Sequence, residues 1–240
     1  MTDSVNFNII GHVHSPYKEK FAIPRQPGLV PAATAELILN KPYSVPEIVR
    51  GLNGFSHVWI IFSFHAIPVG QWKPTVRPPR MGGNQRLGVF ATRSTHRPNP
   101  IGLSVVKLLD IQTGNGQVVL TLDSCDLLDG TPVLDIKPYL PYVDSIPDAV
   151  GGFADSTPDV KFTVCFSIQA ARECELASER LARNVETLIK QLLALDPRPS
   201  YQSGTQGDRI YATHLCDFNL RWRYLANNVV EVIELSRNEE

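Results

Sequence analysis

The stretch GVFATRSTHRPNPIG, at residues 88–102, decides how the first half of this chain is interpreted. Pro98 and Pro100 fix the backbone on either side of Asn99, and this holds the neighbouring side chains in place. Two guanidinium groups, two hydroxyls, an imidazole and an amide fall within RSTHRPNP at residues 93–100, which we call the donor loop. Such a loop suits a carboxylate, a phosphate or a ribose better than an apolar ligand. The alternative is a rigid turn whose arginines only face solvent.

The donor loop lies in a block that carries cations without acids. Residues 48–109 contain no Asp and no Glu, although the whole chain has a formal net charge of only -1. The eight cations of this block are Arg50, Lys73, Arg77, Arg80, Arg86, Arg93, Arg97 and Lys107. Such segregation indicates a surface built for an anion, and a polyanion is the obvious large candidate. The alternative is that these cations pair with the acidic segment that follows, at residues 110–159.

Short strands are predicted on both sides of the donor loop. Residues 57–64, HVWIIFSF, form a continuous apolar run with β-branched and aromatic side chains, which is typical of a central strand. The triplet Gly114-Asn115-Gly116 predicts a hairpin turn. Strands are expected at residues 7–13, 57–64, 87–91, 103–109, 117–122 and 133–136, and a small helix at 46–50 with Ser44 as its N-cap. Many short strands with proline- and glycine-rich connections predict a mainly β fold, a barrel or a sandwich, over residues 1–154.

The pattern changes in the last third of the chain. Residues 155–159 look like a linker, and residues 170–195 carry one apolar stripe that predicts a single long helix, ended by Pro197. Strands are expected at residues 160–168, 210–218, 218–225 and 229–235. Within 218–225, apolar side chains alternate with Asn219, Arg221 and Arg223, so one face of that strand should be cationic. We therefore predict a small α+β module at residues 155–240, packed on the β-rich part.

Several common functional classes have no signature in the sequence. There is no GxxxxGK[ST] phosphate loop, no GxGxxG fingerprint, no HExxH and no GxSxG, so ATP-driven chemistry, a Rossmann cofactor fold and zinc hydrolysis are not expected. No apolar run approaches the length of a membrane span, and the N-terminus lacks the pattern of a secretory signal. The four cysteines have no metal-binding spacing. We expect reduced thiols, no metal, no membrane contact and a cytoplasmic location.

Two other segments could complete a site with the donor loop. The segment SCDLLDGTPVLDIKPYLPY, at residues 124–142, holds Asp126, Asp129 and Asp135, and DGTP predicts a turn. A carboxylate there could bind a ribose diol, an amine or an adenine amino group, or accept a proton. An Asp that only caps its own turn is the alternative.

The segment SPYKEKFAIPRQPG, at residues 15–28, is a second proline-fixed loop and exposes Arg25 and Gln26 between two prolines. His65 closes the predicted strand at 57–64, where side chains often face a pocket. A role for His65 as an ordinary surface or core histidine is the alternative.

These segments together resemble the TsaA-like (YaeB/VirR) family of β-barrel proteins. The resemblance rests on SPYKEKFAIPRQPG, GFSHVWIIFSFH, GVFATRSTHRPNPIGLS and DLLDGTPVLDIKPYLPY. The tail, with DPRPSY at residues 196–201 and RWR at 221–223, is similar to the bacterial tRNA methyltransferase O branch of that family. The resemblance implies a barrel, an S-adenosylmethionine (SAM)-dependent enzyme and a homodimer. It also implies methylation of N6 of N6-threonylcarbamoyladenosine beside the anticodon of threonine tRNA, with no role for DNA.

The resemblance further implies which residues meet the cofactor. They are Pro24, Arg25, Gln26, His65, Ala66, Arg93, Leu103, Asp129, Gly130, Thr131 and Pro132. The chemistry of these residues agrees with such a ligand. Either arginine could pair with the carboxylate of SAM, Asp129 and Gln26 could accept from its amines and ribose, and Leu103 and Ala66 could wall the adenine.

Proton transfer and tRNA binding complete the expected site. The urea-like nitrogen that takes the methyl group carries a proton, and Asp129, His65 or Tyr201 could accept it. Arginine side chains should meet phosphates and fix the register of the RNA. The residues expected to meet tRNA are Arg77, Arg80, Arg86, Asp196, Arg198, Tyr201, Arg221 and Arg223. Two alternatives to an enzyme stay open: a non-catalytic RNA-binding adaptor, and a regulator that senses SAM.

Overall fold

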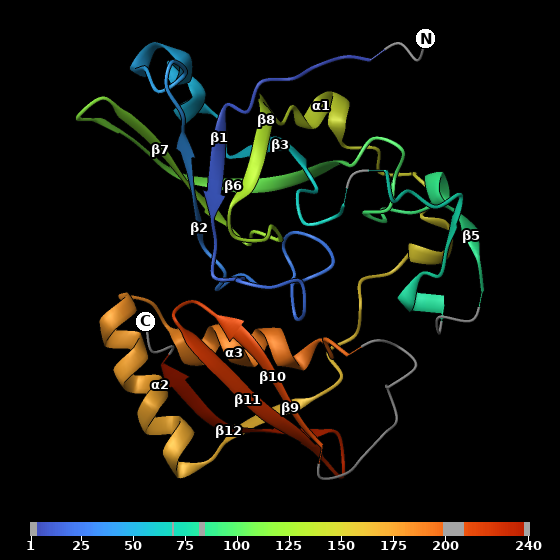
Figure 1. The fold of residues 1–240 in the computed structure, drawn as a ribbon, viewed down its shortest axis with the longest axis vertical. Helices are drawn as coiled ribbons and strands as arrows, with labels where there is room; N and C mark the ends of the chain where they lie inside the picture. Colours follow the sequence, from blue (N-terminus) through green and yellow to red (C-terminus); the bar gives the residue numbers. More distant parts are fainter. Residues whose placement is uncertain (1–3, 69, 82–84, 199–208, 238–240) are drawn as a thin grey trace.

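A computed structural model of the chain describes residues 4–68, 70–81, 85–198 and 209–237. The chain forms a β-barrel, drawn in the upper half of Figure 1, and a C-terminal α+β module, drawn below it. Within the described residues, no helix combines the length and the apolar character needed to cross a membrane.

Six strands close into the barrel in the order β1-β2-β7-β6-β3-β8. Their bounds are β1 Gly11–His14, β2 Ala35–Leu39, β3 His57–Ser63, β6 Ile101–Gly114, β7 Gln117–Asp123 and β8 Thr131–Pro138. All neighbours in this barrel run antiparallel. The predicted mainly β fold is confirmed, and it is the barrel rather than the sandwich.

The alternation of side chains along the strands explains the barrel core. In β7 every second residue is buried, and Val118, Leu120 and Leu122 point inward. Gly102 allows β6 to lie against β3, because a Cβ at this position would come within 2.2 Å of the Phe62 ring. The turn Gly114-Asn115-Gly116 joins β6 and β7 as expected, and Asn115 takes a positive φ of 51°.

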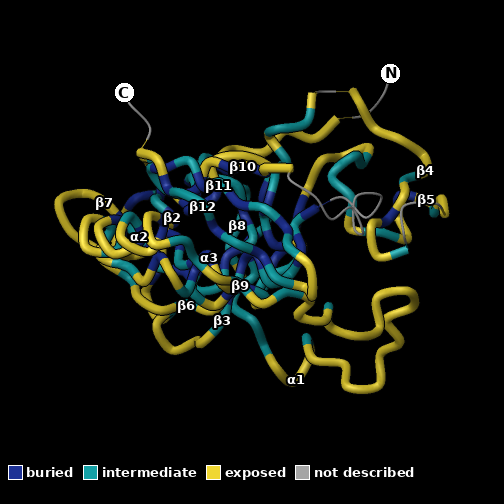
Figure 2. The backbone as a smooth tube through the Cα atoms, turned by 90° about the horizontal axis from the view of Figure 1, so that it is seen from below, coloured by how far each residue is buried: buried dark blue, intermediate teal, exposed yellow. Residues whose placement is uncertain are grey.

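A small hairpin and several short helices lie outside the barrel strands. The hairpin pairs β4 (Thr75–Val76) with β5 (Leu87–Gly88), and Figure 2 shows it set to one side of the buried centre. The one-turn helices are Pro46–Val49, Leu52–Gly54, Pro79–Met81, Val89–Ala91, Gly152–Ala154 and α1 (Pro141–Asp144). The expected helix after residue 45 exists, but Ser44 does not cap it. Ser44 is buried, and its Oγ accepts a hydrogen bond from the Val118 amide at 2.7 Å.

The C-terminal module is a sheet covered on one face by two helices. The sheet has the order β10-β11-β12-β9, with β9 parallel to β12. The bounds are β9 Thr163–Phe166, α2 Ile168–Leu181, α3 Val185–Ala194, β10 Ile210–Leu215, β11 Phe218–Leu225 and β12 Val229–Arg237.

The prediction of one long helix at residues 170–195 was wrong. Ala182 adopts a left-handed conformation with φ of 48°, which ends α2. Asn184 then caps α3, because its side chain accepts a hydrogen bond from the Thr187 amide at 2.8 Å. The apolar stripe continues across the break, so Ala177 and Leu188 bury in the same core.

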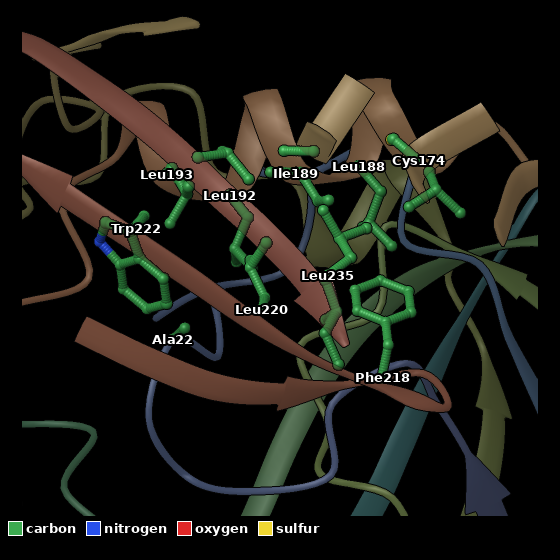
Figure 3. Close-up of a cluster of buried hydrophobic side chains, with 14 of the residues drawn as sticks. Ala22, Cys174, Leu188, Ile189, Leu192, Leu193, Phe218, Leu220, Trp222 and Leu235 are labelled. Carbon is green, nitrogen blue, oxygen red and sulfur yellow. The ribbon is translucent and has the colours of Figure 1, made fainter. Parts of the chain in front are cut away.

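Residues 15–34 of the barrel pack into the core of the C-terminal module. Tyr17 and Ala22 join Trp222 and Leu193 in one buried cluster, part of which Figure 3 shows. Tyr17 also forms a β-bridge with Leu215 at the edge of the sheet. The proline-fixed loop at 15–28 is therefore held between the two parts of the chain.

Candidate functional site

The structure brings the donor loop and the first proline-fixed loop into contact. Arg93 donates a hydrogen bond to Oε1 of Gln26. Pro24 is buried, whereas Arg93 and Arg25 are exposed. Arg25 lies within electrostatic reach of Arg80 and of Asp196. Two segments that lie far apart in the sequence thus meet through Arg93 and Gln26.

The Asp129 turn is tied to the same first loop. Oδ1 of Asp129 accepts from the Ser15 amide at 2.9 Å, and Oδ2 pairs with Lys18 at 2.8 Å. The Gly130 amide donates to the Val13 carbonyl at 2.8 Å, and the Thr131 hydroxyl donates to Leu128 at 2.6 Å. The turn prediction for DGTP is confirmed, since Gly130 has a positive φ of 74°. Asp129 is a carboxylate with both oxygens already engaged.

His65 and Ala66 lie after β3, on the side of the Asp129 turn. The Ala66 carbonyl accepts a hydrogen bond from Lys20 of the first loop. Partial burial and the neighbouring His12 and Lys20 lower the pKa of His65, and Asp129 opposes this shift. This lowered pKa favours the neutral imidazole of His65, which lies within electrostatic reach of Asp129.

Asp126 is a candidate site residue that was not among those predicted from the sequence to meet the cofactor. Burial raises its pKa to about 6, although Ser104 hydrogen-bonds to it and Arg93 lies within electrostatic reach. Its Oδ1 atom is buried and has no hydrogen-bond partner among the described residues. A buried carboxylate oxygen without a donor is costly, so Asp126 is suited to a ligand that brings one. The sequence signal was its position three residues before Asp129, inside the segment already singled out.

Leu103 is not brought to this group. It lies on the outer face of β6 and is 52% exposed, whereas the next residue, Ser104, points inward and is 4% exposed. Side chains of adjacent strand residues point to opposite faces, so Leu103 and the Asp126 carboxylate lie on different sides of β6.

Two of the residues expected to meet tRNA are buried instead. Asp196 and Arg198 are 6% and 4% exposed, and the Arg198 Nε–Asp196 Oδ1 distance is 2.7 Å. The Arg198 guanidinium also stacks 3.5 Å from the centre of the Tyr224 ring, and Tyr224 donates to Asp196 at 3.2 Å. This correction follows from geometry: a buried ion pair inside the module has no surface to offer to a phosphate. Tyr201 lies outside the described residues.

A basic pocket lies beside the donor loop, and we call it the hairpin pocket. It is lined by Lys73, Thr75, Val76, Arg77, Arg86, Ser94 and His96 and has a volume of about 330 Å³. It contains two of the arginines expected to meet tRNA. Arg80, which is also expected to meet tRNA, donates instead to the Ser156 carbonyl.

The described cations of the block at residues 48–109 form almost no ion pairs with carboxylates. In the described part of the chain, Arg50 is its one member with an ion pair, 3.9 Å from Glu47. The cations of the block therefore do not pair with the acidic segment at 110–159. Arg221 and Arg223 differ, because they pair with Glu234 and Glu231 across the sheet, each at 2.7 Å.

Comparison with known proteins identifies the family. The N-terminal domain of tRNA-methyltransferase O matches residues 12–145, and the C-terminal domain of the same family matches residues 159–238. The chain belongs to the tRNA-methyltransferase O family.

Its relatives cover nearly the whole chain. The tRNA (adenine(37)-N6)-methyltransferase of Escherichia coli is 52% identical over 92% of this chain and 93% of its own. A Pseudomonas aeruginosa protein, described as a putative S-adenosylmethionine-dependent methyltransferase RcsF, is 48% identical over 98% of this chain and 99% of its own. A crystal structure of TrmO from Pseudomonas aeruginosa superposes with a TM-score of 0.82, at 41% identity, over 98% of this chain and 100% of that one. The resemblance predicted from the sequence is confirmed.

Proposed function

We propose that this protein methylates N6 of N6-threonylcarbamoyladenosine at position 37 of threonine tRNA, the position that the names of its relatives print. The coarser activity follows from the family: the protein is an SAM-dependent tRNA (adenine-N6)-methyltransferase. The observation that carries the cofactor site is the contact between Arg93 and Gln26, next to the buried Asp126 carboxylate.

The residues of the site fit the chemistry of SAM. Arg93 would pair with the carboxylate, and the unpartnered oxygen of Asp126 would accept from the ammonium group. Pro24, Gln26 and the Asp129 turn would hold the rest from the first loop and from the start of β8. When bound, SAM supplies an electrophilic methyl group, so the protein mainly has to align it with the nucleophilic nitrogen.

Removal of the proton from the target nitrogen falls to His65 among the described residues. Its lowered pKa keeps it neutral near pH 7, so it can accept a proton. Asp129 is a poorer base, because the Ser15 amide and Lys18 already occupy its oxygens. Asp129 instead orients the loop and favours the imidazolium that forms.

Unpaired arginines of the cation block, chiefly Arg77 and Arg86, would meet tRNA phosphates and set the register. Arg221 and Arg223 would add weaker contacts from the C-terminal module, because a glutamate already neutralises each of them. Selection of the modified adenosine would come from stacking in an unpaired loop and from its polar threonyl group. The proposed location is the cytoplasm.

In a homodimer, the exposed Leu103 side chain would pack against the second subunit. Ile101 and Leu103 expose apolar side chains on the outer face of β6. The neighbouring β3 carries α1 on its outer face, where Trp59 Nε1 donates to Asp144 at 3.1 Å. α1 adds Tyr142, which is 87% exposed. Light scattering of the purified protein, with Leu103→Glu as the disrupting variant, tests this assembly.

Two experiments test the function itself. Nucleoside analysis of tRNA from a strain lacking the gene should show the loss of one methylated, hypermodified adenosine from threonine tRNA, restored by the wild-type gene. Calorimetric titration should show that Arg93→Ala binds SAM roughly ten-fold or more weakly, because a charge-assisted hydrogen bond is lost, while its melting temperature is unchanged. An unaltered nucleoside profile would refute the proposed substrate, and unaltered SAM affinity would remove Arg93 from the site.

A further inference from the structure

Two arginines flank the paired residues of the β4–β5 hairpin and line the same pocket. The hairpin pairs Thr75 with Gly88 and Val76 with Leu87, and Arg77 and Arg86 directly adjoin this last pair. Two cations that line one pocket repel each other. Both arginines are exposed, and neither forms an ion pair within the described residues. An anion between them would turn this repulsion into attraction.

The donor loop forms the other wall of the hairpin pocket. Ser94 and His96 line it, and the two are joined by a bond from the His96 amide to the Ser94 hydroxyl at 3.3 Å. The Lys73 amide donates to the His96 carbonyl at 3.2 Å, which fixes the third cation against the loop. The described residues that line the pocket thus supply three cations, an imidazole and two hydroxyls, and none of them carries a carboxylate.

We propose that the hairpin pocket binds a phosphodiester group of an RNA strand. Its volume of about 330 Å³ has room for a phosphate with its flanking sugars, and a fork of two guanidinium groups matches phosphate oxygens. Ser94 directly follows Arg93, so the bound phosphate lies next to the cofactor site. The inference rests on the proposed function, because the RNA strand is the substrate whose adenosine must reach that site.

Exposed aromatic side chains flank the pocket and suit unpaired bases. Trp72, which directly precedes Lys73, is 52% exposed, and Phe90 is 77% exposed. The Val89 amide donates to the Pro74 carbonyl at 3.0 Å, which keeps Phe90 next to the hairpin. The Arg97 guanidinium lies 5.7 Å from the centre of the Phe90 ring. Phosphate contacts with adjacent stacking surfaces are the pattern of a single-stranded loop rather than of a duplex.

The test compares Arg77→Gln/Arg86→Gln with Arg172→Gln, which removes an exposed arginine from α2, far from the hairpin in the fold. Filter binding of tRNA is measured without SAM at about 50 and about 200 mM salt. The double variant should bind roughly ten-fold more weakly at low salt, and the slope of log affinity against log salt should shrink by about one. Trp72→Ala should weaken binding by a similar factor and leave the slope unchanged. A double variant that behaves like Arg172→Gln overturns the site.

The source of the anion is tested with two RNAs, because the threonyl group of the modified base also carries a carboxylate. An unmodified transcript lacks this carboxylate but keeps every phosphate. Equal loss of binding for the transcript and for the modified tRNA supports a phosphodiester. Loss confined to the modified tRNA overturns the phosphodiester and assigns the pocket to the base.

A third arm uses inorganic phosphate on the free protein. Phosphate should raise the melting temperature of the wild type above that in chloride of equal ionic strength, and this difference should vanish in Arg77→Gln/Arg86→Gln. An equal rise in both proteins counts against the pocket. All three arms measure binding, so they distinguish this inference from the proposed function. A wild type that binds tRNA but transfers no methyl group contradicts the proposed function alone. A wild type that methylates tRNA normally, together with a double variant whose tRNA binding is unchanged, contradicts this inference alone.

Discussion

The hairpin pocket and the outer face of β11 each carry two arginines, but their electrostatics are opposite. In the hairpin, Arg77 and Arg86 adjoin the paired residues of β4 and β5 and line one pocket as like charges. In the C-terminal sheet, Arg221 lies opposite Glu234 and Arg223 opposite Glu231, and both pairs close to 2.7 Å. The paired arginines stabilise their own sheet, by a few tenths of a kcal/mol to about 1 kcal/mol each at such exposed positions. The unpaired arginines gain nothing inside the chain, and their benefit has to come from a ligand.

Charge reversal at the two places should give the largest and most opposed effects. Arg77→Glu puts a carboxylate into the pocket that Arg86 also lines, so tRNA binding should fall roughly 100-fold while the melting temperature stays level or rises. Arg223→Glu puts a carboxylate opposite Glu231, so the protein should lose about 1 kcal/mol of unfolding free energy. Filter binding and denaturant unfolding of both variants measure this, with Arg172→Glu as control. Loss of stability in Arg77→Glu would break the contrast.

This contrast explains what the sequence could and could not predict. The strand at 57–64 and the Gly114-Asn115-Gly116 hairpin were predicted because period and turn chemistry are local. The absence of acids from 48–109 correctly indicated unpaired cations. The alternation within 218–225 does not predict the pairing of Arg223 with Glu231, because this pairing depends on the register of the strand that follows the Asn227-Asn228 turn.

Features set by tertiary packing were less accessible. The break between α2 and α3 depends on the cap by Asn184, which interrupts a stripe that continues in the core. Asp196 was expected to meet tRNA because DPRPSY resembles the tail of the family, but Asp196 is buried beside Tyr224 and Arg198. The unpartnered oxygen of Asp126 depends on which strands close over it. Such burial is decided by residues distant in the sequence, and no local pattern records it.

The same distinction between paired and unpaired groups applies to the carboxylates Asp126 and Asp129, and it predicts an effect of intermediate size. Because the pKa of Asp126 is raised from 3.8 to about 6, the folded protein favours its protonated form. The contribution of protonated Asp126 to the free energy of unfolding is complete below the pKa of the unfolded state, and it is lost as the pH rises through about 6. In cofactor-free protein, the unfolding free energy of Asp126→Asn relative to wild type should therefore rise by about 2–3 kcal/mol between about pH 4 and about pH 7.

Binding of SAM provides the second readout for Asp126. Asp126→Asn should weaken SAM binding at neutral pH, because the ammonium group loses an anionic partner, and wild-type affinity should fall below about pH 6 as the carboxylate is protonated. The groups that face Asp126 are Arg93, Ser104, Cys125 and Tyr17. Of these, only Arg93 is charged near that pH, so the variant should abolish the pH dependence. A difference in unfolding free energy that does not change with pH would contradict the assignment.

Neutralisation of the paired arginines should give the smallest effect. Arg221→Gln/Arg223→Gln leaves Glu231 and Glu234 without partners at a half-exposed surface, so the unfolding free energy should change by less than about 1 kcal/mol. Binding of tRNA should weaken only about two- to three-fold and lose its effect at high salt, because each arginine already shares its charge with a glutamate. Conversely, Glu231→Gln/Glu234→Gln should tighten tRNA binding by a similar factor. If neutralisation here costs as much tRNA affinity as in the hairpin pocket, then ion pairing within the chain does not separate structural arginines from those that bind RNA.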